Sequence, residues 1–336
     1  MPLQYASILN EARAVRSFAG IFDVSHMGRL NISGLGAGGL LNRILSVDAT
    51  KLRIGKSKYN LICTENGGII DDCIVYRKAY DNYLLIPNAA NTARVLHWIK
   101  THIKDDQVLI EDETLKYSMI ALQGPESLTI VQQLTSTDLS KLGRFTAVDA
   151  RVAGGDTFLA RTGDTGEDGV ELIIPAQDSH VVWDSIVSKR VAPCGLGSRD
   201  VLRLEAGLLL HGNDMDVTTN PYEAGLDKFV DPDRLEYVAG KSLKYIRDKG
   251  VERKLVGFML LERGIPRQGY QISNGKKRIG EVTSGGYSPT LDRSLGMGYV
   301  PTVHADLNSQ ITIDIRGKHV KAQITNLPFY TRSSTI

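Results

Sequence analysis

The chain has 336 residues, a formal net charge of +2, 42% hydrophobic residues and 23% charged residues. This length predicts two or three domains, and the composition is that of an ordinary globular protein. The charge offers no basic surplus for nucleic-acid binding, and the longest apolar runs are too short to span a bilayer. The first residues lack the pattern of a signal peptide. This favours a bacterial cytoplasm, or a mitochondrial matrix if the source is eukaryotic.

The cysteines and histidines predict no metal site. Cys63, Cys73 and Cys194 are odd in number and widely spaced, which argues against a disulfide framework and against a zinc site. They are expected to be buried free thiols. The seven histidines show no H-E-x-x-H pattern. Residues 34–39 carry a G-x-G-x-x-G spacing, but no βαβ context follows, so no dinucleotide site is predicted.

The spacing of apolar residues predicts both helices and strands. Helices are expected over residues 7–18, 40–45, 89–103 and 198–210, and just after residue 125. Strands are expected over residues 29–32, 59–63, 69–76, 83–86, 119–122, 158–161 and 170–174. From about residue 252 short strands with Gly, Pro and Asn turns continue to the end. A mixed α/β front and a β-rich final third follow from this order.

The most informative stretch is residues 67–72, where two glycines lead into an apolar strand with two adjacent carboxylates. An Asn-Gly turn separates the strands 59–63 and 69–76, which is a strong hairpin signal. Neighbouring residues on a strand face opposite sides, so Asp71 or Asp72 should point into the protein or a cavity. A buried carboxylate is costly without a partner or a function. The structural alternative is a capped turn with one hydrogen-bonded Asp.

A second acidic candidate lies on the strand after the glycine-punctuated loop 161–169. Glu171 alternates with Val170 and Leu172, so it faces away from them. If those two residues face the core, Glu171 faces solvent or a cleft. An exposed strand acid is the alternative.

A positively charged side chain lies in the first turn of the helix predicted over residues 198–210. Ser198 is the expected N-cap, and Arg199 lies in the first turn, where the helix dipole opposes a positive charge. Arg199 therefore needs an anionic ligand or an acidic partner. Asp200 and Glu205 are the partners that the sequence offers.

Six segments in this order resemble the aminomethyltransferase (T-protein) family of the glycine cleavage system, over nearly the whole chain. They are Phe22 to Gly28, Gly67 to Asp72, Leu122 to Pro125, Thr165 to Gly169, Ser198 to Gly207 and Gly280 to Pro289. Folate-dependent demethylases share much of this pattern. The match is therefore more specific for the superfamily than for one reaction.

The resemblance implies an α+β fold, a three-domain cloverleaf around a central tetrahydrofolate site. The first domain would comprise residues 1–30 and 115–222, apparently without its usual N-terminal segment. The second, residues 31–114, would carry Asp72, and the third, residues 223–336, would be a β-rich barrel.

The implied reaction transfers the methylene of the aminomethyl group on lipoylated H-protein to tetrahydrofolate, as co-substrate, and releases ammonia. Asp72 matches the family's essential acid beside the reactive folate nitrogens. Glu171 matches the acid that reads the pteridine, whose ring N–H and amine one carboxylate can accept together. Arg199 matches a folate-contacting arginine. The other matches to folate-lining positions are Tyr59, Tyr76 and Asn88.

The chain departs from the family pattern in three places. A segment usually precedes the Met-Pro-x-x-Tyr of residues 1–5, and loss of a strand there would expose a sheet edge, so low stability is expected. Asp164 stands where a tyrosine is usual, and His211 replaces the tyrosine of a Leu-Tyr-Gly pattern. Two aromatic faces are lost, although His211 can stack and donate a hydrogen bond.

Two other functions stay open. A folate-dependent demethylase would act on a small methylated amine or sulfonium compound and would need no H-protein. A folate-binding regulatory paralogue with weakened catalysis is supported by Asp164 and His211. The presence of Asp72, Glu171 and Arg199 speaks against it.

Overall fold

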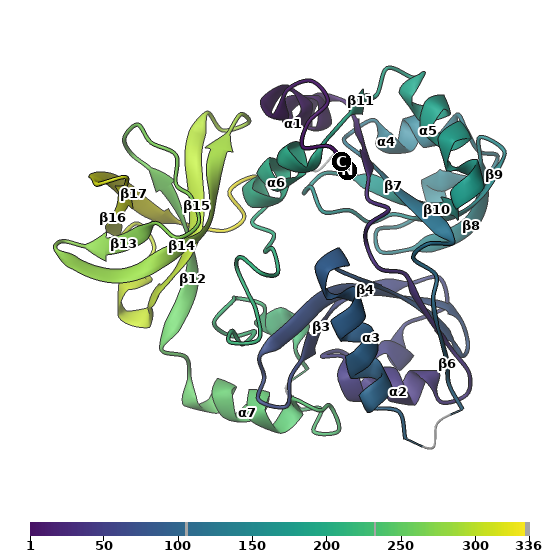
Figure 1. Cartoon of the computed structure of the whole chain (residues 1–336), viewed down its shortest axis with the longest axis horizontal. Coiled ribbons are helices and arrows are strands. Elements are labelled where there is room, and N and C mark those ends of the chain that lie inside the picture. The colour runs from purple at the N-terminus through teal and green to yellow at the C-terminus, as the bar shows by residue number, and fades with distance from the viewer. Residues whose placement is uncertain (105–106, 232, 333–336) are drawn as a thin grey trace.

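A computed structural model of the chain describes residues 1–104, 107–231 and 233–332. Two mixed α/β domains and a closed β-barrel surround the middle of the molecule (Figure 1). The predicted α+β architecture of three domains is therefore confirmed. No helix in these ranges is long and apolar enough to cross a membrane.

The first domain is built on a six-stranded sheet. Its strands are β1 (Gly20–Asp23), β7 (Tyr117–Gln123), β8 (Ala147–Val152), β9 (Gly155–Ala160), β10 (Gly169–Pro175) and β11 (Ala192–Pro193), in the order β11-β1-β7-β10-β9-β8. Its helices are α1 (Ile8–Ser17), α4 (Ser127–Gln132), α5 (Ser179–Val187) and α6 (Leu196–Glu205). Alternation along β10 buries Val170 and Leu172 with residues of α4 and α5 on the outer face.

The second domain is built on a five-stranded sheet. Its strands are β2 (Leu30–Ser33), β3 (Ser57–Cys63), β4 (Ile69–Ala79), β5 (Asn82–Pro87) and β6 (Leu109–Asp112), in the order β3-β4-β5-β2-β6. Helices α2 (Ala37–Ile44) and α3 (Thr92–Thr101) pack on one face. The predicted hairpin of β3 and β4 is confirmed by their antiparallel pairing.

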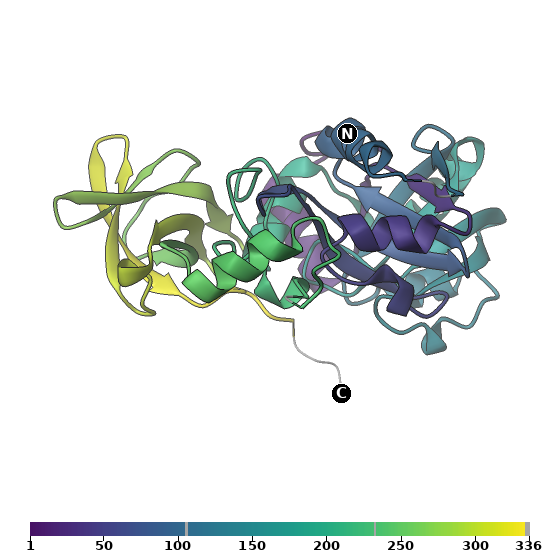
Figure 2. The same cartoon turned by 90° about the horizontal axis from the view of Figure 1, so that it is seen from below.

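The third domain is a closed barrel preceded by helix α7 (Gly240–Lys249). Its strands are β12 (Arg253–Leu260), β13 (Gln271–Asn274), β14 (Lys277–Ser288), β15 (Arg293–Pro301), β16 (Gln310–Ile315) and β17 (Lys318–Thr325). Short 3₁₀ turns lie at Ala49–Lys51, Ala89–Asn91, Leu139–Lys141, Ala176–Asp178, Asp227–Phe229 and Thr302–His304. Figure 2 shows the barrel at one end of the molecule, with α7 running from it toward the second domain.

The inner faces of the two sheets share one hydrophobic core. Phe22 and Ala121 of the first sheet belong to the same buried cluster as Tyr76 and Ile86 of the second. Because each sheet is covered by helices on its other face, this shared core fixes the two domains against each other. The functional candidates on the two inner faces are thereby brought together.

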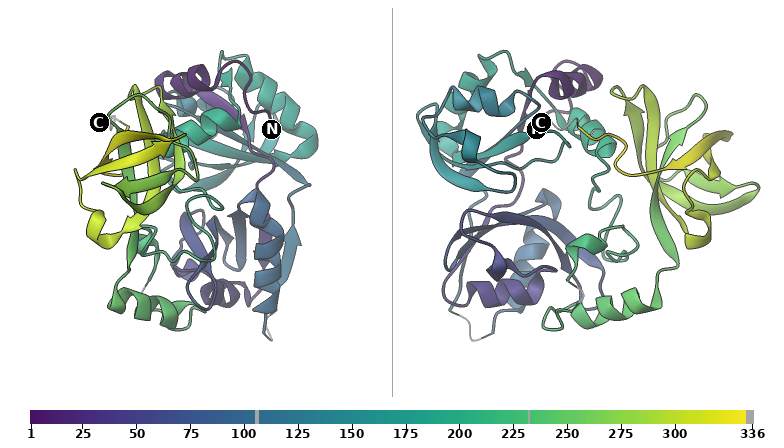
Figure 3. Two further views of the ribbon diagram at one scale, coloured as in Figure 1. Left: turned by 60° about the vertical axis from the view of Figure 1, so that its left-hand side comes forward. Right: turned by 180° about the vertical axis from the view of Figure 1, so that it is seen from behind.

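The chain between the first domain and the barrel crosses the middle of the molecule (Figure 3). Residues 209–246, which the predicted boundaries divide between the first and third domains, pack against the tip of the β3–β4 hairpin. Ile69 N donates to the carbonyls of Asp216 and Thr219 at 3.1 and 3.0 Å. The hairpin that carries the two carboxylates is thus anchored by a distant part of the chain.

Two local expectations about the sixth helix are wrong. α6 begins at Leu196 with Gly195 as the N-cap, and the hydroxyl of Ser198 instead donates to Glu11 and to the Gly195 carbonyl. The helix ends at Glu205 rather than residue 210, because Gly207 takes a positive φ of 63° and turns the chain. The apolar periodicity continues past this turn, so it overstated the helix.

The hairpin turn requires glycine for a tertiary reason. A Cβ atom at Gly68 would lie 1.9 Å from the carbonyl oxygen of Val217. We predict that Gly68→Ala lowers the free energy of unfolding by about 1–3 kcal/mol, the usual scale of overpacking. Chemical denaturation followed by circular dichroism measures this.

The matched control is Gly39→Ala in α2, where the added methyl has only the flexible tip of Arg43 within 4 Å, at 3.8 Å. Alanine is the better helix former, so this variant should be neutral or slightly more stable. Equal stability of both variants would contradict the steric account of Gly68.

Candidate active site

Two carboxyl groups lie side by side at the start of β4. Asp71 is completely buried, whereas Asp72 is half-buried. The Asn88 side-chain amide donates to Asp71 Oδ1 at 2.9 Å and to Asp72 Oδ1 at 2.8 Å. The expectation that one of the two carboxylates points inward is confirmed, and both are bridged by one amide.

Strand register explains why Asn88 lies there. β5 pairs with β4 up to the pair of Pro87 and Cys73, so the next residue along β5 comes opposite Asp72. The Asn88 backbone N–H donates to Asp71 Oδ2 at 2.9 Å. Asn88, predicted here as a folate-lining residue, therefore first serves to hold the carboxylate pair.

The environment shifts the proton affinity of Asp72. Burial, followed by the charges of Asp71 and Asp164, raises the pKa of Asp72 to about 7. The hydroxyl of Tyr59 interacts with the Asp72 carboxyl, and burial holds the pKa of Tyr59 well above its ordinary value. A carboxyl group with a pKa near neutrality can both accept and return a proton.

The second group of candidates lies on the inner face of the first sheet. Phe22 is paired with Ala121, and Ala121 is paired with Glu171. These three side chains therefore form a row across three strands. The expectation that Glu171 faces away from Val170 and Leu172 is confirmed, and it faces a pocket whose lining includes Phe22 and Ala121.

Glu171 is held from behind by two hydroxyl groups. Thr162 Oγ1 donates to Glu171 Oε2, and the Tyr76 hydroxyl lies 2.9 Å from Thr162 Oγ1. Burial raises the pKa of Glu171, and the Thr162 hydrogen bond and the charge of Arg199 oppose that shift. Tyr76 is only 1% exposed and packs edge-to-face on Phe158. In this structure Tyr76 supports Glu171 from within the core.

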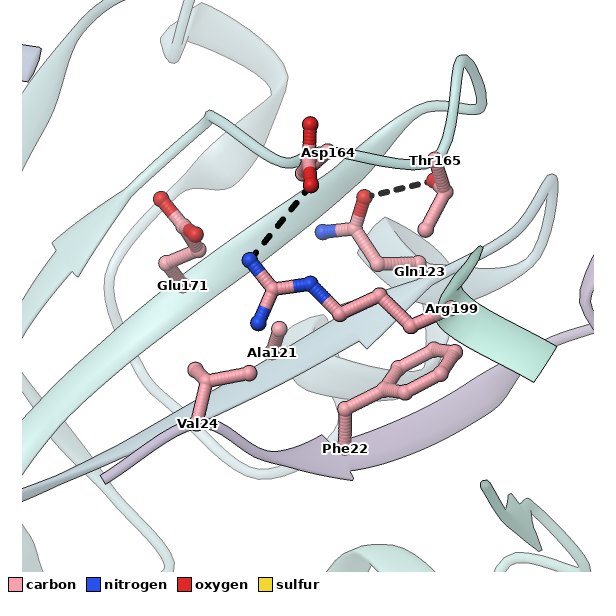
Figure 4. Close-up of a pocket in the computed structure, with 8 residues that line it drawn as sticks. All are labelled: Phe22, Val24, Ala121, Gln123, Asp164, Thr165, Glu171 and Arg199. Carbon is pink, nitrogen blue, oxygen red and sulfur yellow. Dashed lines mark hydrogen bonds and ion pairs between the residues drawn. The ribbon is translucent and has the colours of Figure 1, made fainter. Parts of the chain in front are cut away.

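Arg199 extends from α6 into the same pocket. Figure 4 shows its guanidinium group between Glu171 and Asp164, next to the apolar side chains of Val24 and Ala121. Its Nη2 atom lies 3.4 Å from Asp164 Oδ2. The sequence left open an anionic ligand or a salt bridge to Asp200 or Glu205. The salt bridge to either of these two is not formed, because the acidic loop folds over the helix N-terminus and supplies Asp164 instead.

The two expected partners of Arg199 belong to other arginines. Asp200 pairs with Arg203, and Glu205 pairs with Arg16 of α1. Arg203 also donates to Asp214 Oδ2 and to Ser284 Oγ of the barrel, each at 2.8 Å. α6 is therefore fixed between the first domain and the barrel, and this fixes the position of Arg199.

Sequence reasoning missed several residues of the site. Asn91 donates to Asp71 Oδ1 at 2.7 Å, and Gln123 accepts from the Thr165 hydroxyl at 2.9 Å beneath the acidic loop. Asn91 and Thr162 carried no signal in the sequence, because a buried amide or hydroxyl looks like any loop residue. Gln123 lies within one of the family motifs, so its position could have been noticed.

The described ranges contain no group of three or more His, Cys, Asp or Glu side chains able to hold a metal ion. The three cysteines are buried free thiols, as expected. Burial raises the pKa of Cys63 and of Cys194 to about 12.

Comparison with known proteins agrees with this architecture. The family description "GCVT N-terminal domain" matches residues 1–234, and "Glycine cleavage T-protein C-terminal barrel domain" matches residues 253–331. The chain belongs to the glycine cleavage T-protein family. It is accordingly an enzyme of the aminomethyltransferase type.

Relatives in this family resemble the chain over almost its full length. The aminomethyltransferase of Listeria monocytogenes (serotype 4a) is 42% identical over 99% of this chain and 92% of its own. That of Rubrobacter xylanophilus is 43% identical over 99% of this chain and 88% of its own. The crystal structure of the glycine cleavage system aminomethyltransferase T from Bartonella henselae superposes with a TM-score of 0.93 at 32% identity, covering 98% of this chain and 91% of that one.

The pKa of Asp72 predicts a pH-dependent stability difference. Between the ordinary value of 3.8 and about 7 the folded protein keeps a proton on Asp72, whereas the unfolded chain has released it. The stability that this proton contributes is present at low pH and is lost as the pH rises through about 7. Asp72→Asn removes the effect. We expect its advantage over the wild type in unfolding free energy to grow by about 1–4 kcal/mol from pH 4 to pH 8.

Denaturant unfolding at a series of pH values measures this difference. Asp156→Asn is the matched control, because it removes a carboxylate whose side chain is 83% exposed. The plot of unfolding free energy against pH for this variant should run parallel to that of the wild type. A parallel curve for Asp72→Asn as well would contradict the raised pKa.

Proposed function

We propose that the chain transfers the methylene carbon of the aminomethyl group on the lipoyl arm of H-protein to tetrahydrofolate, with release of ammonia and of the reduced lipoyl arm. The supporting observation is that Asp164 lines the same pocket as Glu171 and pairs with Arg199. Its charge also contributes to the raised pKa of Asp72, which belongs to the second domain. This supports a reaction in which Asp72 acts as the acid–base group on a ligand held by Glu171 and Arg199. The family membership supports the same reaction.

The residues that line the pocket have the chemical groups that recognition of a pteridine needs. Phe22, Val24 and Ala121 offer an apolar surface, and Glu171 offers carboxylate oxygens at its edge. A carboxylate can accept a ring N–H and an exocyclic amine side by side. Arg199 supplies a guanidinium for a carbonyl oxygen or an anionic group.

Bound tetrahydrofolate would supply the nitrogen nucleophile for the methylene carbon. Glu171 and Arg199 would hold it in one orientation, which lowers the entropic cost of the reaction. Asp72 would take up the proton released from the attacking nitrogen and return a proton to the departing amine, so that this carbon–nitrogen bond breaks as ammonia leaves. Attack of the second folate nitrogen on the same carbon would break the carbon–sulfur bond, and the proton released there would pass to the lipoyl thiolate. In its ionised form Asp72 would also stabilise positive charge on the methylene group. Tyr59 would hold the Asp72 carboxyl in place.

Asp164 changes the charge of this pocket. Its carboxylate pairs with Arg199, so it competes with any anionic group of a ligand for that guanidinium. This is the observation that favours the regulatory paralogue with weakened catalysis as the second candidate. We propose the same cytoplasmic location for both functions.

Ammonia release from aminomethyl-loaded, lipoylated H-protein tests the proposed reaction. We expect strong stimulation by tetrahydrofolate. Asp72→Asn should cut turnover by about 100-fold or more, the usual scale for losing such a group, with tetrahydrofolate binding largely intact. Unchanged turnover would remove Asp72 from the mechanism.

The same assay separates the alternatives. Tetrahydrofolate binding without stimulated ammonia release would contradict the proposed reaction. Activity on a small methylated amine without H-protein would then identify a demethylase, and no activity on either substrate would favour the regulatory paralogue.

Glu171→Ala should weaken tetrahydrofolate binding by about 10- to 100-fold, because hydrogen bonds to a charged group contribute about 1.5–3 kcal/mol each. Calorimetric titration measures the dissociation constant. Glu65→Ala, a change on the exposed hairpin turn, is the control and should bind normally. An unaltered constant for Glu171→Ala would exclude its role in binding.

A further inference from the structure

The orientation of one histidine ring follows from its two contacts. His211 Nε2 lies 3.0 Å from the carbonyl oxygen of Ile69, and Nδ1 lies 2.9 Å from Asn91 Nδ2. A carbonyl oxygen can only accept, so the ring proton of the neutral imidazole lies on Nε2. Nδ1 therefore carries the lone pair, and the Asn91 amide donates to it.

His211 and Asp71 together determine which way the Asn91 amide faces. The same Nδ2 atom of Asn91 also donates to Asp71 Oδ1 at 2.7 Å. A flipped amide would turn its oxygen toward the Nδ1 lone pair and toward the Asp71 carboxylate, which gives two repulsive contacts. With the Nδ1 acceptor in place, only the amide orientation that supplies Asp71 with an N–H is favourable.

The chain of contacts continues to Asp72. Asp71 accepts from the Asn88 backbone N–H, from the Asn88 side chain and from Asn91, while completely buried. The Asn88 side chain donates in turn to Asp72. Five side chains from three segments are thus connected in one hydrogen-bonded series: His211, Asn91, Asp71, Asn88 and Asp72.

We propose that His211 is a positioning residue for the transfer reaction: by accepting from Asn91 through Nδ1, it keeps Asp71 supplied with donors and so fixes the protonation and the aim of Asp72. This inference rests on the proposed function, since only there does Asp72 act on a substrate. His211 itself reaches the Asp72 carboxyl only through these intermediates.

Electrostatics around the pair agree with this role. Burial raises the pKa of Asp71, and the donors from Asn88 and Asn91 oppose that shift. An ionised Asp71 in turn raises the pKa of Asp72. Loss of the Asn91 donor should therefore move the first proton toward Asp71 and lower the pKa of Asp72.

Other ionisable groups face these residues and contribute to the pH dependence of the site. They are Tyr59 on β3, Cys73 on β4, Asp164 on the acidic loop and Asp216 after His211. Burial raises the pKa of Cys73 and of Tyr59 well above their ordinary values, so both stay neutral in the working range. Asp164 and Asp216 are left unchanged by the substitutions below.

Two substitutions separate the two contacts of the ring. His211→Asn keeps an acceptor oxygen near the position of Nδ1 and loses the bond to Ile69. His211→Gln keeps a donor near the position of Nε2 and loses the acceptor for Asn91. Any effect of His211 that is merely structural should appear in the melting temperature of both variants, which is measured alongside.

The test follows turnover against pH with lipoylated H-protein and tetrahydrofolate. We expect His211→Gln to lower kcat by about tenfold, the upper scale of one lost hydrogen bond. It should leave KM for tetrahydrofolate within about twofold and displace the acidic limb of the kcat profile to lower pH. His211→Asn should keep the wild-type limb and most of the turnover. Equal losses in both variants, or no loss in either, would overturn the proposal.

A second readout does not depend on activity. Carboxyl carbon NMR of the full chain follows the titration of Asp72, assigned by its absence in Asp72→Asn. We expect a lower midpoint in His211→Gln and the wild-type midpoint in His211→Asn. An unchanged midpoint in both variants would contradict the proposed role of the hydrogen-bonded series. If the wild type releases no ammonia, the proposed function fails, and this titration still decides whether His211 controls the carboxyl pair.

Discussion

Shielding two adjacent carboxyl groups from water, one completely buried and one half-buried, is the constraint on which the rest of this site depends. Such groups are tolerated inside a protein only if N–H donors replace water. The Asn88 amide reaches both Asp71 and Asp72 because β5 ends where β4 begins its polar pair. The same burial raises the pKa of Asp72 to about 7. The environment that holds the two carboxyl groups in place is therefore also the one that gives Asp72 a pKa near neutrality.

The packing of two sheets through their inner faces shapes the pocket that we propose as the folate site. Apolar side chains of both sheets form the shared core, and Glu171 adds a carboxylate to the row of Phe22 and Ala121. A polar group at the margin of an apolar contact favours a ligand with a flat ring and a hydrogen-bonding edge. Neither domain alone presents both this pocket and the Asp72 carboxyl.

The third domain contributes through the elements that it holds in place. Contacts of Arg203 with Asp214 and Ser284 fix α6 against the barrel, and α6 carries Arg199. The segment between α6 and the barrel anchors the β3–β4 hairpin and supplies His211, which contacts both Ile69 and Asn91. The barrel and its connection therefore set the geometry of residues that belong to the other two domains.

The sequence by itself determined the strand alternation, the hairpin and the α+β class with its final barrel, because periodicity and motif order are local properties of the chain. The same motif order put forward Asp72, Glu171 and Arg199 as candidate site residues. The sequence failed where partners are distant. The pairing of Arg199 with Asp164, the end of α6 at Glu205 and the bridge from His211 through Asn91 to the carboxyl pair were decided by tertiary structure. Hydrogen bonds and ion pairs are made between neighbours in space, and which side chains become neighbours depends on how the two sheets and the barrel pack.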